Sequence, residues 1–68
     1  MNFIIIEMQT SGGATAVVTP IYCSGDRTES EAVFLEKCAA ARRSGLAVHT
    51  VILLDNEGKQ LAKKTFKA

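Results

Sequence analysis

The stretch Phe3-Ile4-Ile5-Ile6 is an unbroken apolar run, and Val51-Ile52-Leu53-Leu54 repeats the pattern later in the chain. Continuous apolar runs of this length favour strands that are covered on both faces. A chain of 68 residues has little material to cover both sides of a sheet. We therefore expect part of the cover to come from a second copy of the chain or from a partner.

Composition places the chain among folded proteins, with 47% hydrophobic and 22% charged residues and a net charge of +1. The length predicts one domain, residues 1–68. Domains this short are usually stabilised by disulfides, by a metal or by oligomerisation. The residues below favour oligomerisation.

Four strands and one helix are predicted from hydrophobic periodicity and turn residues. Pro20 falls inside the second strand and cannot donate a ladder hydrogen bond, so that strand should be an edge strand or bulged there. The turns are expected at residues 10–13 and 55–58, both of which contain glycine. The predicted strands are residues 3–9, 14–22, 47–55 and 60–66.

The helix is predicted over residues 29–44. Thr28 followed by Glu31 has the spacing of a capping box, and Gly45 is suited to end the helix in a left-handed conformation. Its buried stripe is expected to consist of Phe34, Leu35, Cys38 and Ala41.

This order predicts an α+β fold, ββαββ, with a four-stranded antiparallel sheet in the order 2-1-3-4 and one helix on one face. The two doubly apolar strands belong in the centre. The strand with Pro20 and the lysine-rich last strand belong at the edges. The connection through the helix is then a right-handed crossover that passes over the first strand.

Such a sheet is about 19 Å wide, from four strands at about 4.8 Å spacing. One helix is about 10–12 Å across, so it leaves apolar surface open. We expect a homodimer, or a higher oligomer, through the sheet face that the helix does not cover, because soluble monomers rarely expose a large apolar patch. A register error of one residue would exchange the two faces. The residues expected at this self-association surface are Phe3, Ile5, Val51 and Leu53.

No catalytic, cofactor or metal site is predicted. Cys23 lies just before the helix and Cys38 about 15 Å along it, too far for a disulfide, so both thiols should be reduced. His49 is expected as a strand-end imidazole at the surface or at an interface. A Cys–His nucleophile would pair His49 with Cys23 or Cys38, and the predicted order of elements gives no reason for His49 to approach Cys23. We therefore expect a protein that is not an enzyme.

Four lysines follow one another without an acidic residue after Gly58: Lys59, Lys63, Lys64 and Lys67. They have two interpretations. Lysines on an exposed edge strand prevent it from pairing with the strands of other chains and so prevent aggregation. Lysines also contact the phosphates of polyanions in nucleic-acid-binding proteins. The first interpretation is favoured, and the second is retained as a candidate polyanion contact.

The N-terminal apolar run is too short for a signal peptide, and no apolar stretch approaches the length of a membrane span. We expect a cytoplasmic protein with no membrane association.

Three segments of the chain resemble a group of short bacterial proteins that are uncharacterised in function and often found in prophages and other mobile elements. These segments are Glu29-Ser30-Glu31-Ala32 with the alanine run that follows it, Leu53-Leu54-Asp55-Asn56-Glu57-Gly58, and the opening residues 4–10. The resemblance covers most of the chain but supplies no active site. It implies a small accessory or interaction protein. Together with the two strands that are apolar on both faces, this predicts a module that self-associates and binds a protein partner. The alternative is a nucleic-acid-binding module that uses the lysine-rich last strand.

Overall fold

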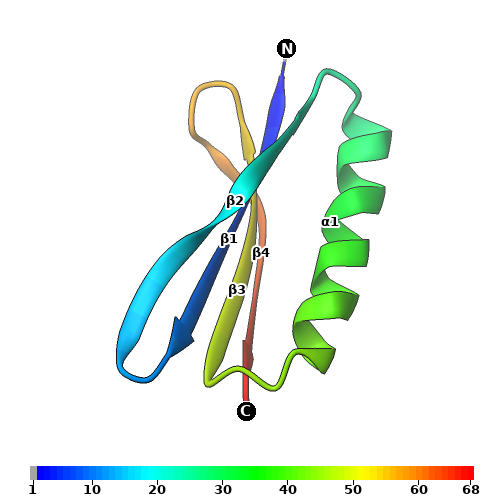
Figure 1. Cartoon of the computed structure of the whole chain (residues 1–68). Coiled ribbons are helices and arrows are strands. Elements are labelled where there is room, and N and C mark those ends of the chain that lie inside the picture. The colour runs from blue at the N-terminus through cyan, green and yellow to red at the C-terminus, as the bar shows by residue number, and fades with distance from the viewer. Residues whose placement is uncertain (1) are drawn as a thin grey trace.

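The computed structural model describes residues 2–68 as a four-stranded sheet with one helix packed on it (Figure 1). The predicted ββαββ order is confirmed. The sheet is one layer and the helix the second, and the opposite face of the sheet carries no helix. The elements are β1 (Phe3–Ser11), β2 (Ala14–Ser24), α1 (Arg27–Arg43), β3 (Val48–Asp55) and β4 (Gln60–Lys67).

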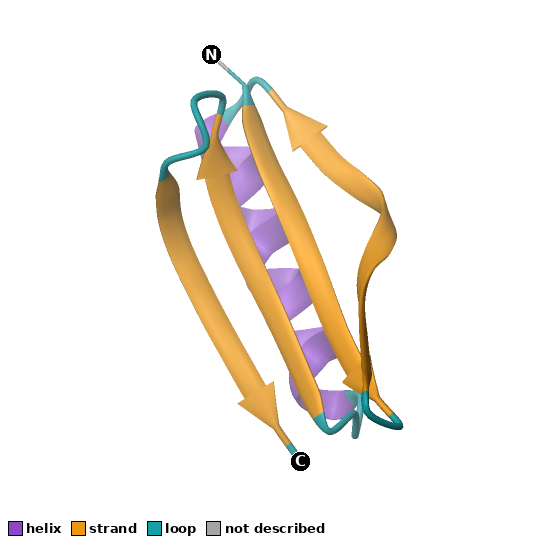
Figure 2. Cartoon of the chain, turned by 90° about the vertical axis from the view of Figure 1, so that its left-hand side faces the viewer, coloured by secondary structure: helices purple, strands orange, loops and turns teal. Residues whose placement is uncertain are grey.

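The strands lie in the order β2-β1-β3-β4, and every neighbouring pair is antiparallel. This confirms the predicted sheet. Figure 2 looks onto the face without the helix, with α1 behind the two central strands. The doubly apolar strands β1 and β3 are central because they bury the most apolar surface there.

The edge strand β2 is bulged at Pro20, as predicted. Tyr22 pairs with Ile5 and Val18 pairs with Glu7, so three β2 residues, 19–21, stand opposite the single β1 residue Ile6. The proline ring removes a ladder donor, and the bulge puts that gap where no pairing is needed.

The turn between β3 and β4 is fixed by the side chain of Asp55. Its Oδ1 accepts hydrogen bonds from the backbone N–H groups of Glu57 and Lys59, each at 2.9 Å. Gly58, in the turn predicted at residues 55–58, adopts a left-handed φ of 83°, which glycine tolerates. These bonds explain why a carboxylate is tolerated at 8% exposure.

Helix α1 begins two residues earlier than predicted, and its N-cap is Asp26 rather than Thr28. The Asp26 carboxylate accepts a hydrogen bond from the backbone N–H of Glu29 at 3.0 Å, and its carbonyl accepts one from the hydroxyl of Ser30 at 2.7 Å. Thr28 lies inside the first turn. The prediction failed because two capping residues stand close together and either one could start the helix.

Replacing Asp26 with alanine should lower the free energy of unfolding by about 1 kcal/mol, the usual cost of losing an N-cap. Thr28→Ala is the matched control, with an expected change within about 0.5 kcal/mol because Thr28 is an exposed helical residue. Urea denaturation of both variants measures the difference. A larger loss in Thr28→Ala would place the helix start where the sequence predicted it.

The core lies between α1 and the central strands. Phe34, Cys38 and Ala41 are spaced by four and three residues and therefore share one side of the helix. Leu35 is 66% exposed, so its assignment to the buried stripe is wrong. It stands about 100° around the helix from Phe34. The buried hydrophobic residues are Phe3, Ile5, Phe34, Cys38, Ala41, Val51 and Leu53.

Candidate functional site

The sheet face opposite α1 carries large aliphatic side chains on both central strands. Along β3, buried and half-buried residues alternate, so successive side chains point to opposite sides of the sheet. Ile52 and Leu54 point away from the helix, and they pair with Ile6 and Ile4 on β1. We call Ile4, Ile6, Met8, Ile52 and Leu54 the uncovered face.

The four residues predicted for self-association lie on the other side of the sheet. Phe3, Ile5, Val51 and Leu53 are between 0% and 5% exposed and belong to the core beneath α1. The prediction therefore exchanged the two faces and is corrected to the uncovered face. The exchange arose because runs that are apolar on both sides contain no polar alternation to show which set meets the helix.

The edge strands frame the uncovered face with different chemistry. On β2, Val17 pairs with Met8 and is 50% exposed, and Cys23 pairs with Ile4. On β4, Lys63 pairs with Ile52. The two acidic residues of the strands, Glu7 and Asp55, both alternate onto the helix side. The uncovered face is thus apolar in the middle with lysine on one edge.

The four C-terminal lysines are all exposed but do not form one row. Lys63 and Lys67 pair with Ile52 and Val48, so both lie on the uncovered side of the sheet. Lys64 pairs with Val51 and lies on the helix side, and Lys59 precedes β4 in the turn. The structure brings two of the predicted polyanion contacts to one face and separates the other two from it.

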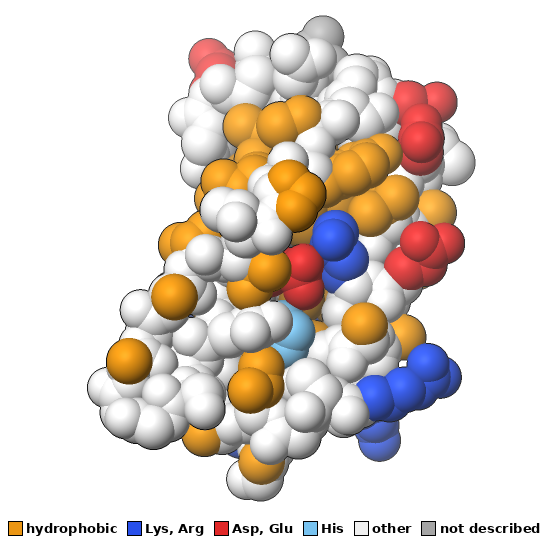
Figure 3. All heavy atoms as spheres, viewed as in Figure 1, with side chains coloured by type: hydrophobic (Ala, Val, Ile, Leu, Met, Phe, Trp, Pro, Cys, Tyr) orange, Lys and Arg blue, Asp and Glu red, His pale blue; other side chains and the backbone are white. Residues whose placement is uncertain are grey.

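A chain of polar side chains crosses the seam between the sheet and α1. The two carboxylate oxygens of Glu7 contact His49 Nε2 at 3.1 Å and Lys37 Nζ at 3.2 Å. His49 Nδ1 lies 3.3 Å from the hydroxyl of Ser44. Figure 3 shows the single histidine in this seam with acidic and basic atoms beside it. We call Glu7, Lys37, Ser44 and His49 the polar seam.

The sequence prediction missed the polar seam. His49 is 4% exposed, so the first of its two expected positions, at the surface, is wrong, and the second, at an interface, stays a prediction. The signal was present: Glu7 and His49 each stand two residues from a core residue on the same strand face, beyond Ile5 and before Val51. Without a known register between the two strands, however, their pairing could not be derived.

Ser44, His49 and Glu7 have the composition of a nucleophilic triad, but their hydrogen bonds have another direction. The Ser44 hydroxyl donates to the carbonyl oxygen of Ala41 at 2.7 Å, and it accepts from the backbone N–H of Leu46. Its proton is therefore directed to the helix end and away from the imidazole. An activated serine would donate to the histidine. The side chains of the seam connect α1 to the strands β1 and β3 through hydrogen bonds and an ion pair.

Replacing Glu7 with alanine should lower the free energy of unfolding by about 1–3 kcal/mol, because the buried His49 Nε2 and the Lys37 ammonium both lose their partner. Glu31→Ala is the matched control, since Glu31 forms only an exposed helix pair with Arg27 at 3.7 Å. That pair should contribute less than about 0.5 kcal/mol. Thermal and urea melts of both variants test this, and equal small losses would show that the seam stabilises nothing.

The two cysteines are free and occupy unlike environments: Cys23 is exposed on β2, and Cys38 is buried in the core. Burial raises the pKa of the Cys38 thiol above its ordinary value of 9.0, with Lys64 lowering it and Glu7 raising it to smaller extents. A raised pKa leaves little reactive thiolate at Cys38, so this buried side chain contributes to packing. Across residues 2–68, no group of three or more His, Cys, Asp or Glu is placed to hold a metal ion.

Compared with known protein families, with curated proteins and with solved structures, the chain matches none. The resemblance to short prophage-borne proteins therefore stays a prediction from the residues themselves. In the described part of the chain, α1 is the single helix, and it is neither long nor apolar enough to cross a membrane.

Proposed function

We propose that the protein is a non-enzymatic interaction module that forms a homodimer through the uncovered face and binds a protein partner. The observation that carries this proposal is the row of five large aliphatic side chains on the central strands, on the side of the sheet that has no helix. These side chains are half-buried by their neighbours within the strands and make no part of the core cluster.

The area of this face suits a small dimer. A sheet about 19 Å wide and about 26 Å long, from eight-residue strands at about 3.3 Å per residue, presents about 500 Å². Two copies would together bury about 1,000 Å², which is the lower end of what specific interfaces need. Thr10, Thr50 and Lys63 share this face, so its apolar centre is smaller than the whole area and lies within the range of apolar patches that monomers expose. The area therefore permits a dimer without requiring one.

The uncovered face is suited to pairing with a second copy of itself, because its centre is apolar and its charged residues lie at the rim. When two such sheets pack face to face, the isoleucine-rich centres meet, and Lys63 and Lys67 stay at the rim. The acidic residues of the strands lie on the far side, so no carboxylate is buried in the contact. Symmetric pairing of one surface with itself is the commonest arrangement among small oligomers.

The alternative is a nucleic-acid-binding module that uses the lysine-rich strand. The observation in its favour is that Lys63 and Lys67 flank an apolar sheet face. Binding by lysine contacts to phosphates weakens steeply with salt, whereas apolar association does not.

Two free thiols, one of them exposed, suit the reducing cytoplasm, which is the location we propose. The resemblance suggests that a phage or another mobile element encodes the chain.

Multi-angle light scattering of the purified protein at micromolar concentration tests the proposal. The expected mass is twice the 7.3 kDa of one chain, and it should be insensitive to salt. A mass of 7.3 kDa with a cooperative melting transition would refute the dimer. A mass that rises only when nucleic acid is added, and falls again with salt, would favour the alternative.

A further inference from the structure

A second surface, on the helix side, is also left open by the single helix. Between α1 and β4 lie two adjoining hollows of about 200 and 300 Å³, which share Phe34 and Leu35 in their walls. We call this surface the α1–β4 groove. Its main lining residues are Phe34, Leu35, Leu61, Ala62, Lys64 and Phe66.

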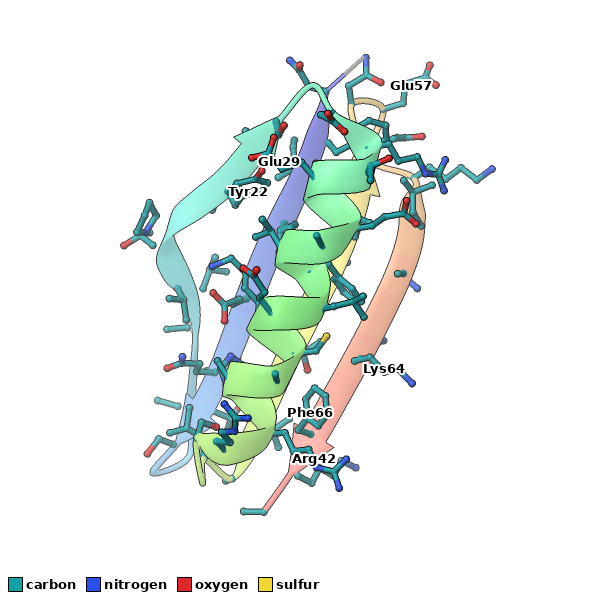
Figure 4. The ribbon with its side chains drawn as sticks, turned by 90° about the vertical axis from the view of Figure 1, so that its right-hand side faces the viewer. Tyr22, Glu29, Arg42, Glu57, Lys64 and Phe66 are labelled. Carbon is teal, nitrogen blue, oxygen red and sulfur yellow. The ribbon has the colours of Figure 1, made fainter. Side chains whose placement is uncertain are left out.

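The groove can seat a second helix that extends past the edge of the sheet. One helix about 10–12 Å across leaves a strip of about 7–9 Å on a sheet about 19 Å wide, so a second helix in this strip would project beyond β4. In Figure 4, α1 lies in front of the central strands and β4 runs alongside it. The open strip lies over β4, parallel to α1.

The floor and one wall of the groove are apolar. Leu61, Ala62 and Phe66 are half-buried on β4 and pack against the edge of the core. Leu35 projects from α1 with 66% of its surface exposed, although it is a large aliphatic residue. An exposed leucine above a half-buried phenylalanine is the arrangement in which an amphipathic helix inserts its apolar side chains.

Charge distinguishes the two ends of the groove. Near the N-terminus of α1, Arg27 and Glu31 pair with each other at 3.7 Å. Near its C-terminus, Arg42 and Lys64 line the groove beside Phe66, and neither forms an ion pair with any of residues 2–68 (Figure 4). The end of the groove beside Phe66 is therefore basic and uncompensated.

We propose that the α1–β4 groove binds an amphipathic α-helix of a partner protein, antiparallel to α1, with acidic residues in its N-terminal half. The apolar side of that helix packs on Leu35 and Phe66, and its carboxylates meet Arg42 and Lys64. Acidic residues near a helix N-terminus are also favoured by the partner's own dipole, which selects this direction. The proposal rests on the protein-binding part of the proposed function and gives the partner its chemistry.

The test is a selection from phage-displayed 17-residue peptides with a fixed leucine and alanine helical stripe. The flanking positions are randomised among glutamate, glutamine and lysine. Wild-type protein should enrich glutamate in the N-terminal half of the peptides. The Arg42→Glu/Lys64→Glu variant should enrich lysine there instead, and should bind the peptides selected on wild type about tenfold more weakly. Both substituted residues are exposed, so the fold should persist.

Ile52→Lys separates this proposal from the dimer. That substitution interrupts the uncovered face, so it should leave the glutamate preference of the groove intact even where it abolishes self-association. Failure to enrich any peptide, equal binding to the charge-reversed variant, or loss of binding in an Ile52→Lys protein that circular dichroism shows to be folded would overturn the groove proposal. A dimer of Ile52→Lys that Leu35→Lys dissociates would also overturn it, because the occupant would then be a second copy.

Discussion

Leu53→Ala is expected to lower the free energy of unfolding by about 2–5 kcal/mol, the range for truncating a fully buried leucine. Leu53 is 2% exposed on β3, beneath α1, and belongs to the buried core. Its core neighbours across the sheet and in the helix would each lose packing contacts.

Leu35→Ala is the matched control, because it makes the same change at a position that is 66% exposed. Its expected effect is within about 0.5 kcal/mol. Urea denaturation at one fixed protein concentration compares the two, since the stability of a dimer depends on concentration. If Leu35→Ala cost as much as Leu53→Ala, the helix would have to be rotated toward the stripe predicted from the sequence.

Ile52→Lys is expected to convert the proposed dimer to a monomer. Ile52 lies near the middle of the uncovered face, paired with Ile6, and a two-fold axis would bring two such lysines into one apolar interface. A buried charge without a partner costs several kcal/mol, and the side chain faces water freely in the monomer. Light scattering measures the mass, and circular dichroism checks that the fold persists.

Leu35→Lys provides the control for this substitution. It introduces the same lysine in place of an aliphatic residue, but on the helix side of the molecule. The dimer should survive it. Dissociation in Leu35→Lys together with an intact dimer in Ile52→Lys would move the interface from the sheet to the helix.

The strand order could be predicted from the sequence because individual residues limit where each strand can lie. Pro20 has no backbone N–H to donate to a neighbouring strand, so β2 belongs at an edge of the sheet. The lysines of β4 need contact with water, so β4 belongs at the other edge. The two apolar runs were then left for the centre. The choice of face was beyond this reasoning, because Ile5 and Ile6 are equally apolar and only the position of α1 distinguishes them.

The polar seam and the side of α1 that faces the sheet could not be predicted from the sequence, because both are set by contacts between elements. Glu7 and His49 are 42 residues apart and meet only through the β1–β3 register. Leu35 and Phe34 are both compatible with a buried stripe until the helix is set on the sheet. Local patterns therefore determined the elements, whereas the groove and the uncovered face followed from how these elements pack.

The most direct test of the proposed dimer is an isotope-filtered nuclear Overhauser experiment on an equal mixture of ¹³C-labelled and unlabelled protein. Contacts between copies should connect methyl groups of the uncovered face, namely Ile4, Ile6, Ile52 and Leu54, with one another across the interface. Signals between copies that arise only from Leu35 and its neighbours on α1, or no such signals at all, would contradict a dimer through the sheet.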